Sequence, residues 1–130
     1  MSQAKIKLLI VDDEKDICNF VKLLFRKKKL SVYSALSGNQ AVRLAKKIKP
    51  DIALLDIHLK KGMNGIEVLQ KLKELMPACR CVIVTWDEAQ EKIKQARALG
   101  AAGYLTKPLT ANQLLKVVSR IAKNIGQGGK

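Results

Sequence analysis

The stretch LLIVDDE, residues 8–14, places three acidic side chains directly after a run of four apolar residues. A short apolar run that stops at charged residues is typical of a buried β-strand. We therefore predict a strand over residues 6–11, with Asp12 and Asp13 at its end. Whether these carboxylates form a site depends on which side chains the other strands bring to the same edge.

Four further apolar runs predict strands over residues 31–35, 52–55, 81–84 and 103–105. Segments with helical periodicity separate these runs, and strands that alternate with helices form a parallel sheet in an α/β fold. Asp56, Thr85 and the pair Lys107–Pro108 follow three of the strands. In open parallel sheets the ligand site lies outside the carboxyl ends of the strands. We therefore expect one site at this edge, built by Asp12, Asp13, Asp56, Thr85 and Lys107.

The predicted helices carry their own start and stop signals. The first is expected over residues 13–28, and Ser37, Asn64 and Thr110 are suitable N-terminal caps for three others. The helix over residues 88–99 has few apolar side chains to bury, so we expect it to be the least firmly held.

Length and composition indicate one domain. With 130 residues, 48% of them hydrophobic, the chain suits a single core, which we assign to residues 1–124, followed by a flexible tail over 125–130. No apolar run approaches the roughly 18 residues of a membrane span, and the N-terminus lacks the apolar stretch of a signal peptide. We expect a cytoplasmic protein that does not enter a membrane.

The three cysteines do not indicate a metal site. Cys18 lies in the first predicted helix, and Cys79 and Cys81 form a C-x-C pair in a chain with a single histidine. A structural zinc site needs a second pair of ligands. Buried, small apolar side chains are the favoured interpretation.

A formal charge of +14 is the unusual feature of the composition. The basic residues are spread over the whole chain, and no aromatic residues alternate with them to stack on bases. A solvated basic surface is therefore favoured over direct nucleic-acid binding. Electrostatic attraction of an acidic protein partner is the remaining alternative.

The predicted site has the chemistry of phosphoryl transfer. Carboxylates that converge on one pocket repel one another unless a cation joins them, and a small all-oxygen set suits Mg²⁺. Lys107 and Thr85 can then stabilise phosphoryl oxygens, while Asp56, at the end of the central strand, is the best placed nucleophile. Taken alone, Asp13 could be only a helix cap.

This pattern resembles the receiver domain of two-component response regulators. The motifs that carry the resemblance are LLIVDDE (8–14), DIALLDIHL (51–59), MNGIEVL (63–69), VIVTW (82–86) and GAAGYLTKPL (100–109). They cover nearly the whole chain. The resemblance implies a flavodoxin-like doubly wound (βα)₅ sandwich whose five-stranded parallel sheet has the order 2-1-3-4-5.

The resemblance also implies a ligand set for Mg²⁺. Asp13, Asp56 and the backbone carbonyl of His58 would bind the ion, and Asp12 would act through water. Like other receivers, the domain would catalyse its own phosphorylation and slow dephosphorylation without being an enzyme for another substrate.

Further roles follow from the same resemblance. Asp56 would accept a phosphoryl group from a histidine kinase or phosphotransfer protein, Lys107 would contact that group, and Pro108 would follow a cis peptide bond. Thr85 and Tyr104 would form a switch that repacks the surface of the fourth helix, fifth strand and fifth helix, where an output domain or target protein would read it. The chain would be a monomer or a phosphorylation-linked dimer.

Three features depart from the family pattern. Trp86 stands where receivers usually have a small residue; it either crowds the site and slows autodephosphorylation or turns outward as a partner contact. The sequence Lys60–Lys61–Gly62 replaces the usual proline and alters the loop after the third strand. His58 either tunes hydrolysis or adds a metal ligand, or it is an exposed residue whose backbone alone matters.

Two alternative functions compete with a phosphorylated switch. A phosphohydrolase would need a second general acid and a substrate cavity, for which the chain offers no insertion. A pseudo-receiver, which is a non-phosphorylated interaction module, would be expected to have lost at least one of the five site residues. Whether the domain acts alone or within a longer regulator is not decided by its sequence.

Overall fold

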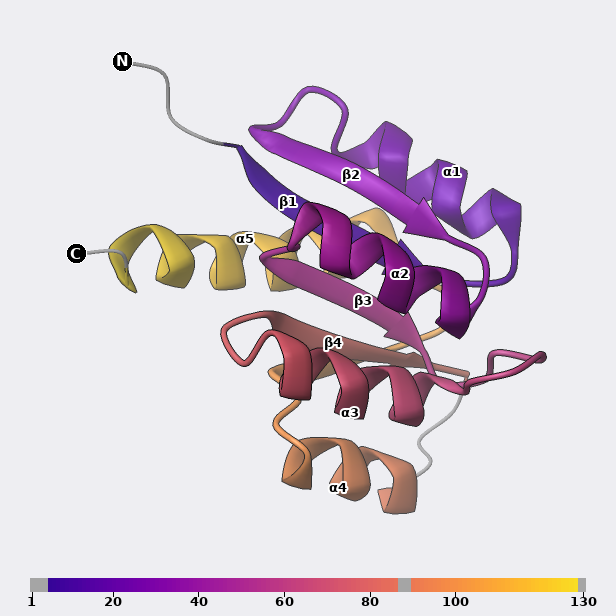
Figure 1. Cartoon of the computed structure of the whole chain (residues 1–130). Helices are drawn as coiled ribbons and strands as arrows, with labels where there is room; N and C mark the ends of the chain where they lie inside the picture. Colours follow the sequence, from indigo (N-terminus) through magenta and orange to yellow (C-terminus); the bar gives the residue numbers. More distant parts are fainter. Residues whose placement is uncertain (1–4, 87–89, 129–130) are drawn as a thin grey trace.

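The computed structural model describes residues 5–86 and 90–128, which form five strands and five helices in strict alternation (Figure 1). In chain order they are β1 (Ile6–Val11), α1 (Lys15–Leu24), β2 (Leu30–Ala35), α2 (Gly38–Ile48), β3 (Ile52–Asp56), α3 (Gly65–Leu75), β4 (Arg80–Thr85), α4 (Gln90–Ala98), β5 (Gly103–Thr106) and α5 (Ala111–Gly128). All strand pairs are parallel and their order is β2-β1-β3-β4-β5. The predicted doubly wound (βα)₅ sandwich is confirmed.

The sheet separates two apolar cores, because successive side chains of a strand point to opposite faces. In β1, Leu9 and Val11 pack into the core beneath α2, α3 and α4, whereas Leu8 and Ile10 pack into the core beneath α1 and α5. Figure 1 shows this arrangement, with α2, α3 and α4 in front of the sheet and α1 and α5 behind it. Burial on both faces explains why the strands read as continuous apolar runs.

The register of the sheet gathers the polar strand ends. The pairs that fix it are Val11 with Leu55, Asp56 with Val84, and Thr85 with Thr106. Asp12 directly follows Val11, the partner of Leu55. Lys107 directly follows Thr106, the partner of Thr85. Strands β1, β3, β4 and β5 thus deliver Asp12, Asp56, Thr85 and Lys107 to the carboxyl edge of the sheet.

The ends of several helices differ from their predicted positions. α1 ends at Leu24, and although Phe25 is still buried, residues 26–29 are all charged and exposed, so no apolar side chain beyond Phe25 ties a further turn to the core. The predicted start of α4 at residue 88 lies outside the described residues. α5 continues to Gly128, past the boundary that we expected at residue 124, and the flexibility of residues 125–130 stays a prediction.

The predicted N-terminal caps are present. Ser37 and Thr110 each accept a hydrogen bond from the backbone N–H three residues later. At Asn64 a complete capping box forms with Glu67, whereas the side chain of Gln40 accepts the N–H of Leu36 instead of that of Ser37.

Among the residues that the structure describes, no helix is long and apolar enough to cross a membrane.

The start of α3 presses directly against the strand end that carries Asp56. A Cβ atom added to Gly65 would overlap the carbonyl oxygen of Asp56 and lie 2.7 Å from Ile57 Cα. We predict that Gly65→Ala destabilises the fold by about 1–3 kcal/mol, because backbone atoms would have to move. Gly103→Ala is the control, since its Cβ would lie 3.7 Å from Arg120 Nη2, an ordinary contact. Urea denaturation measures both; equal free energies of unfolding would contradict the predicted overlap.

Candidate functional site

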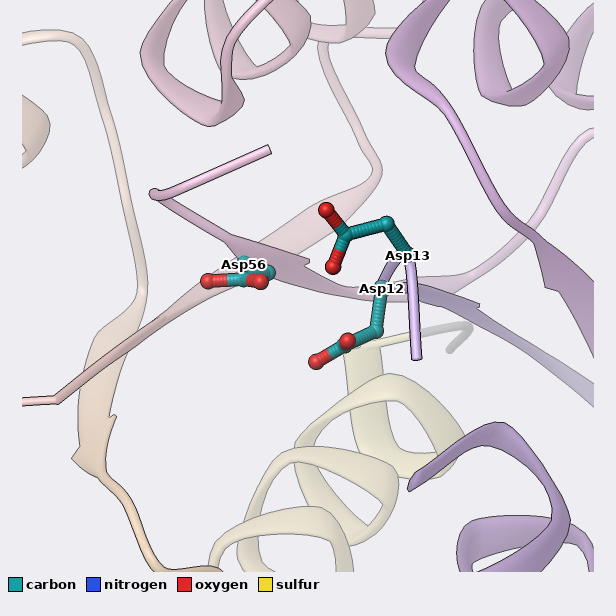
Figure 2. A group of neighbouring side chains, drawn as sticks. All are labelled: Asp12, Asp13 and Asp56. Carbon is teal, nitrogen blue, oxygen red and sulfur yellow. The ribbon is translucent and has the colours of Figure 1, made fainter. Parts of the chain in front are cut away.

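Three carboxylates converge at the carboxyl edge of the sheet (Figure 2). Asp12 and Asp13 follow β1 and Asp56 ends β3, and one oxygen from each lies within 4.8 Å of the others. Asp12 and Asp56 are buried, and Asp13 is half-buried. Such a cluster is unfavourable unless cations balance its charge.

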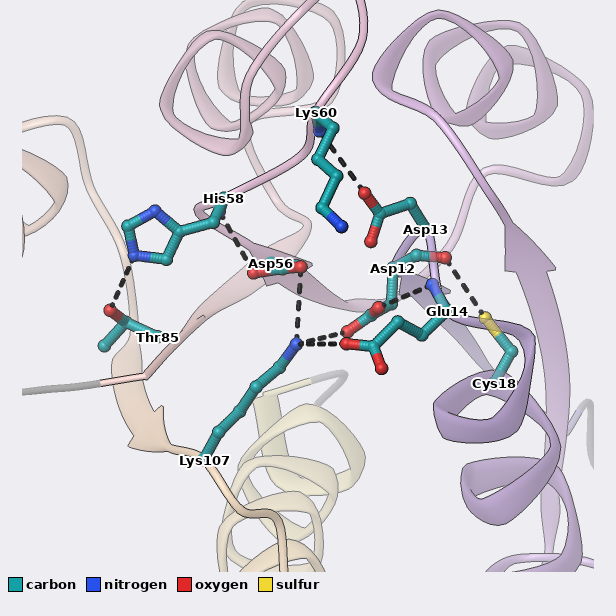
Figure 3. A network of polar contacts seen from close by, with 9 residues as sticks. All are labelled: Asp12, Asp13, Glu14, Cys18, Asp56, His58, Lys60, Thr85 and Lys107. Atoms are coloured by element: carbon teal, nitrogen blue, oxygen red, sulfur yellow. Dashed lines mark hydrogen bonds and ion pairs between the residues drawn. The ribbon is translucent and has the colours of Figure 1, made fainter.

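Lys107 supplies one of these cations from the loop after β5. Its Nζ atom lies 3.0 Å from Asp12 Oδ2, 3.4 Å from Asp56 Oδ2 and 3.6 Å from Glu14 Oε2 (Figure 3). Burial lowers the pKa of Lys107, but its close contacts with the negative charges of Asp12 and Asp56 outweigh burial, so the pKa is raised. Lys107 is therefore a permanent cation at the floor of the site.

Asp12 is the carboxylate with the least favourable environment. Burial raises its pKa and the charge of Asp56 adds to the effect, although the hydrogen bond from the Glu14 backbone and the ion pair with Lys107 lower it. Its Oδ1 accepts the N–H of Glu14 at 2.9 Å. Its Oδ2 faces Lys107 as an ion pair but accepts no directed hydrogen bond from the described residues. This buried oxygen retains a free lone pair for a cation or a water molecule.

The loop between β3 and α3 wraps around the carboxylates. The backbone N–H of His58 donates to Asp56 Oδ1 at 3.0 Å, and that of Lys60 donates to Asp13 Oδ2 at 3.3 Å. Gly62 adopts a φ of 67°, which the altered turn of this loop requires. A cavity of about 330 Å³ opens between this loop and Ser37, beside Asp13. The site is therefore accessible from the side of the β3–α3 loop.

Thr85 ends β4, and Trp86 follows it, on the other side of Asp56. Thr85 is fully buried, and its Oγ1 lies 3.5 Å from Nε2 of His58. Trp86 is 56% exposed, and the centroid of its ring lies 5.5 Å from Nζ of Lys107. The indole therefore lies beside the site as a cation–π partner of Lys107.

Tyr104 lies away from the carboxylates. Its side chain is 41% exposed, and the guanidinium carbon of Arg97 in α4 lies 5.5 Å from the centroid of its ring.

The peptide bond between Lys107 and Pro108 is cis, the isomer implied by the family resemblance.

All three cysteines are free and buried. The Sγ atom of Cys18 lies 3.5 Å from the carbonyl oxygen of Asp12, and burial raises the pKa of this thiol to about 11. The hydrogen bond with Cys81, followed by burial, raises the pKa of Cys79. These thiols are packing groups, as the sequence indicated.

The structure therefore brings together the five residues expected at this edge, which are Asp12, Asp13, Asp56, Thr85 and Lys107. Several contacts were missed from the sequence, among them two made to Lys107 and Asp13. Glu14 is a third acidic partner of Lys107, which the DDE triplet could have suggested, and the backbone of Lys60 holds Asp13. Sequence spacing does not show which backbone N–H groups a loop will turn toward a carboxylate.

Comparison with known proteins identifies the family. Residues 8–119 match the family model of the response regulator receiver domain. The chain belongs to this family. It is 32% identical over 114 residues to sporulation initiation phosphotransferase F of Bacillus subtilis, a match that covers 88% of this chain and 91% of that protein.

Solved receiver structures share the fold. Chemotaxis protein CheY4 of Vibrio cholerae superposes with a TM-score of 0.84 at 28% identity, covering 91% of this chain and 99% of that one. A two-component response regulator of Clostridium difficile gives a TM-score of 0.86 at 28% identity, covering 93% and 98%. NtrX of Brucella abortus gives a TM-score of 0.84 at 25% identity. The match covers 91% of this chain but 27% of the NtrX chain. The same domain thus occurs both as nearly a whole chain and within a longer one.

The raised pKa of Asp12 has a consequence for stability. Because folding raises the pKa of Asp12, the ionised carboxylate lowers the free energy of unfolding at neutral pH. This destabilisation is lost as the pH falls and Asp12 takes up a proton. We predict that Asp12→Asn raises the melting temperature of the metal-free protein at neutral pH, and by less in acid. Asp16→Asn, at an exposed position in the first turn of α1, is the control. A lower melting temperature for Asp12→Asn would show that its attraction to Lys107 dominates.

Proposed function

We propose that this receiver domain is a phosphorylation-dependent switch in which Asp56 accepts a phosphoryl group from a histidine kinase or phosphotransfer protein. The observation that carries the proposal is the buried carboxylate of Asp56, which shares one cation, Lys107, with Asp12. Membership of the receiver family supports the same role, since receivers are regulatory phosphoacceptors. The protein would act in the cytoplasm and would catalyse only its own phosphorylation and dephosphorylation.

The donor set fits Mg²⁺. The three clustered carboxylates offer hard oxygen ligands, and Asp12 Oδ2 lacks a directed hydrogen bond from the described residues. Asp13, Asp56 and the backbone carbonyl of His58 would hold the ion, with Asp12 acting through water. When bound, Mg²⁺ neutralises charge on the carboxylates and on an incoming phosphoryl group.

The residues of the chain divide the transfer between them. The N–H of His58 and the ammonium of Lys107 each hold one oxygen of Asp56 and so orient the carboxylate for in-line attack. A bond forms between a carboxylate oxygen and phosphorus, while the bond from phosphorus to the donor imidazole nitrogen breaks and the imidazole leaves. Lys107 keeps its proton throughout and stabilises the phosphoryl oxygens.

The output would come from Thr85 and Tyr104. Thr85 would turn its hydroxyl toward the phosphoryl group, and Tyr104 would turn inward, breaking its contact with Arg97 on α4. α4 buries only Ile93 and Ala96 within its described length, which makes it easy to shift. The repacked surface of α4, β5 and α5 would be read by an output domain or target protein, or by a second copy in a phosphorylation-linked dimer. The charge of +14 would steer acidic partners to the domain.

Phosphorylation of Asp56 is tested most simply with a small donor. Incubation with acetyl phosphate and Mg²⁺ should add one phosphoryl group to the wild-type protein and to Asp16→Asn, but none to Asp56→Asn. Intact-mass spectrometry reads the result, and chelation of the metal should abolish the modification. An unmodified wild-type protein would favour the pseudo-receiver, whereas a modified Asp56→Asn would place the acceptor elsewhere.

Trp86 should slow the loss of the phosphoryl group. Its ring lies beside Lys107 and so crowds the approach of an attacking water. We predict that autodephosphorylation is several-fold faster in Trp86→Ala and intermediate in Trp86→Phe, which keeps a smaller ring. Decay of the phosphorylated protein after removal of the donor measures the rates. Equal decay in wild type and Trp86→Ala would contradict this role and leave Trp86 as a partner contact.

A further inference from the structure

The imidazole of His58 lies against the hydroxyl that the proposed switch needs. Nε2 of His58 and Oγ1 of Thr85 are 3.5 Å apart, and Figure 3 shows the two side chains facing each other across the end of the sheet. Thr85 is fully buried. Among the described residues, His58 is the side chain that offers this hydroxyl a hydrogen bond.

The position of His58 is fixed by its backbone. The N–H of His58 donates to Asp56 Oδ1 at 3.0 Å, and the N–H of the preceding Ile57 donates to the carbonyl of Val84 at 2.9 Å. Ile57 is buried, which anchors the turn further. The backbone that carries the exposed imidazole is therefore held on both sides, next to Asp56 and to β4, and from there the side chain reaches Thr85.

We propose that His58 is a positioning residue that holds the Thr85 hydroxyl in its inactive orientation and competes with the phosphoryl group for it. This inference rests on the proposed function. A threonine hydroxyl has a single hydrogen to donate, so donation to a phosphoryl oxygen excludes donation to Nε2. In the other tautomer the imidazole carries its proton on Nε2 and donates it to Oγ1, which also holds the hydroxyl beside His58. In both cases the contact must break before Thr85 can turn toward Asp56.

The contact is long enough to be broken in each signalling cycle. At 3.5 Å it lies at the outer limit of hydrogen bonding, and such bonds contribute little net free energy. Its loss would shift the equilibrium toward the active state without a change in the metal ligands, because alanine at residue 58 keeps the backbone carbonyl. His58 would thus affect the equilibrium between the inactive and active states, whereas the carboxylates would be required for phosphorylation itself.

A double-mutant cycle with beryllofluoride, which mimics the phosphoryl group, tests the inference. Beryllofluoride is titrated in saturating Mg²⁺ and followed by the fluorescence of Trp86, the one tryptophan of the chain. The proteins are wild type, His58→Ala, Thr85→Ala and the double variant. We expect His58→Ala to bind beryllofluoride about three- to tenfold more tightly, the range of one weak hydrogen bond.

Two controls separate this role from a general structural effect. His58→Ala should have no effect on beryllofluoride affinity in the Thr85→Ala background, because the hydroxyl is already absent. His58→Gln, whose amide can still bond to Thr85, should resemble wild type. The affinity for Mg²⁺ alone, measured by the same fluorescence, should be equal in wild type and His58→Ala.

Three results would overturn the inference. Weaker binding by His58→Ala would mean that the imidazole contacts the phosphoryl group itself. An equal effect of His58→Ala with and without the Thr85 hydroxyl would show that His58 acts by another route, and no effect at all would show that the contact carries no energy. In these cases the phosphoacceptor function stands, whereas a wild-type protein that binds no beryllofluoride would overturn the proposed function and the inference together.

Discussion

The balance of charge between three carboxylates and one buried ammonium is the constraint on which the rest of this structure depends. Asp12, Asp13 and Asp56 each hold one oxygen within 4.8 Å of the others, and Lys107 is the buried cation between two of them. The arrangement leaves the pKa of Asp12 raised and one of its oxygens without a directed hydrogen bond from the described residues. A site that retains unfavourable negative charge is prepared for a divalent cation, and with the cation for a phosphoryl group.

The fold supplies this site by backbone register alone. Parallel pairing of β1, β3, β4 and β5 places the residue after each strand at one edge, and two apolar cores hold the sheet from both sides. The helices and loops then refine the geometry: Gly65 brings α3 against Asp56, and the N–H groups of His58 and Lys60 hold the two carboxylates. Close backbone packing therefore lies directly behind Asp56.

The sequence predicts the sheet and the carboxylates well because both depend on short-range patterns. Apolar runs define the strands, and in a parallel sheet the polar residues that end them must share an edge. Contacts that depend on side-chain rotamers or on loop paths could not be predicted in this way. The approach of His58 to Thr85 and the position of Trp86 beside Lys107 arise from packing between segments distant in sequence. The DDE triplet shows that Glu14 adds a third negative charge after β1, but it does not show that Glu14 contacts Lys107.

The central claim is that this cluster receives a phosphoryl group on Asp56, and a crystal structure of the protein with beryllofluoride and Mg²⁺ tests it most directly. The account predicts beryllium bonded to an oxygen of Asp56, Mg²⁺ between Asp13 and Asp56, Lys107 in contact with fluoride, and the hydroxyl of Thr85 turned from His58 toward the adduct. Intact carboxylates without an adduct, or an adduct on another residue, would contradict it.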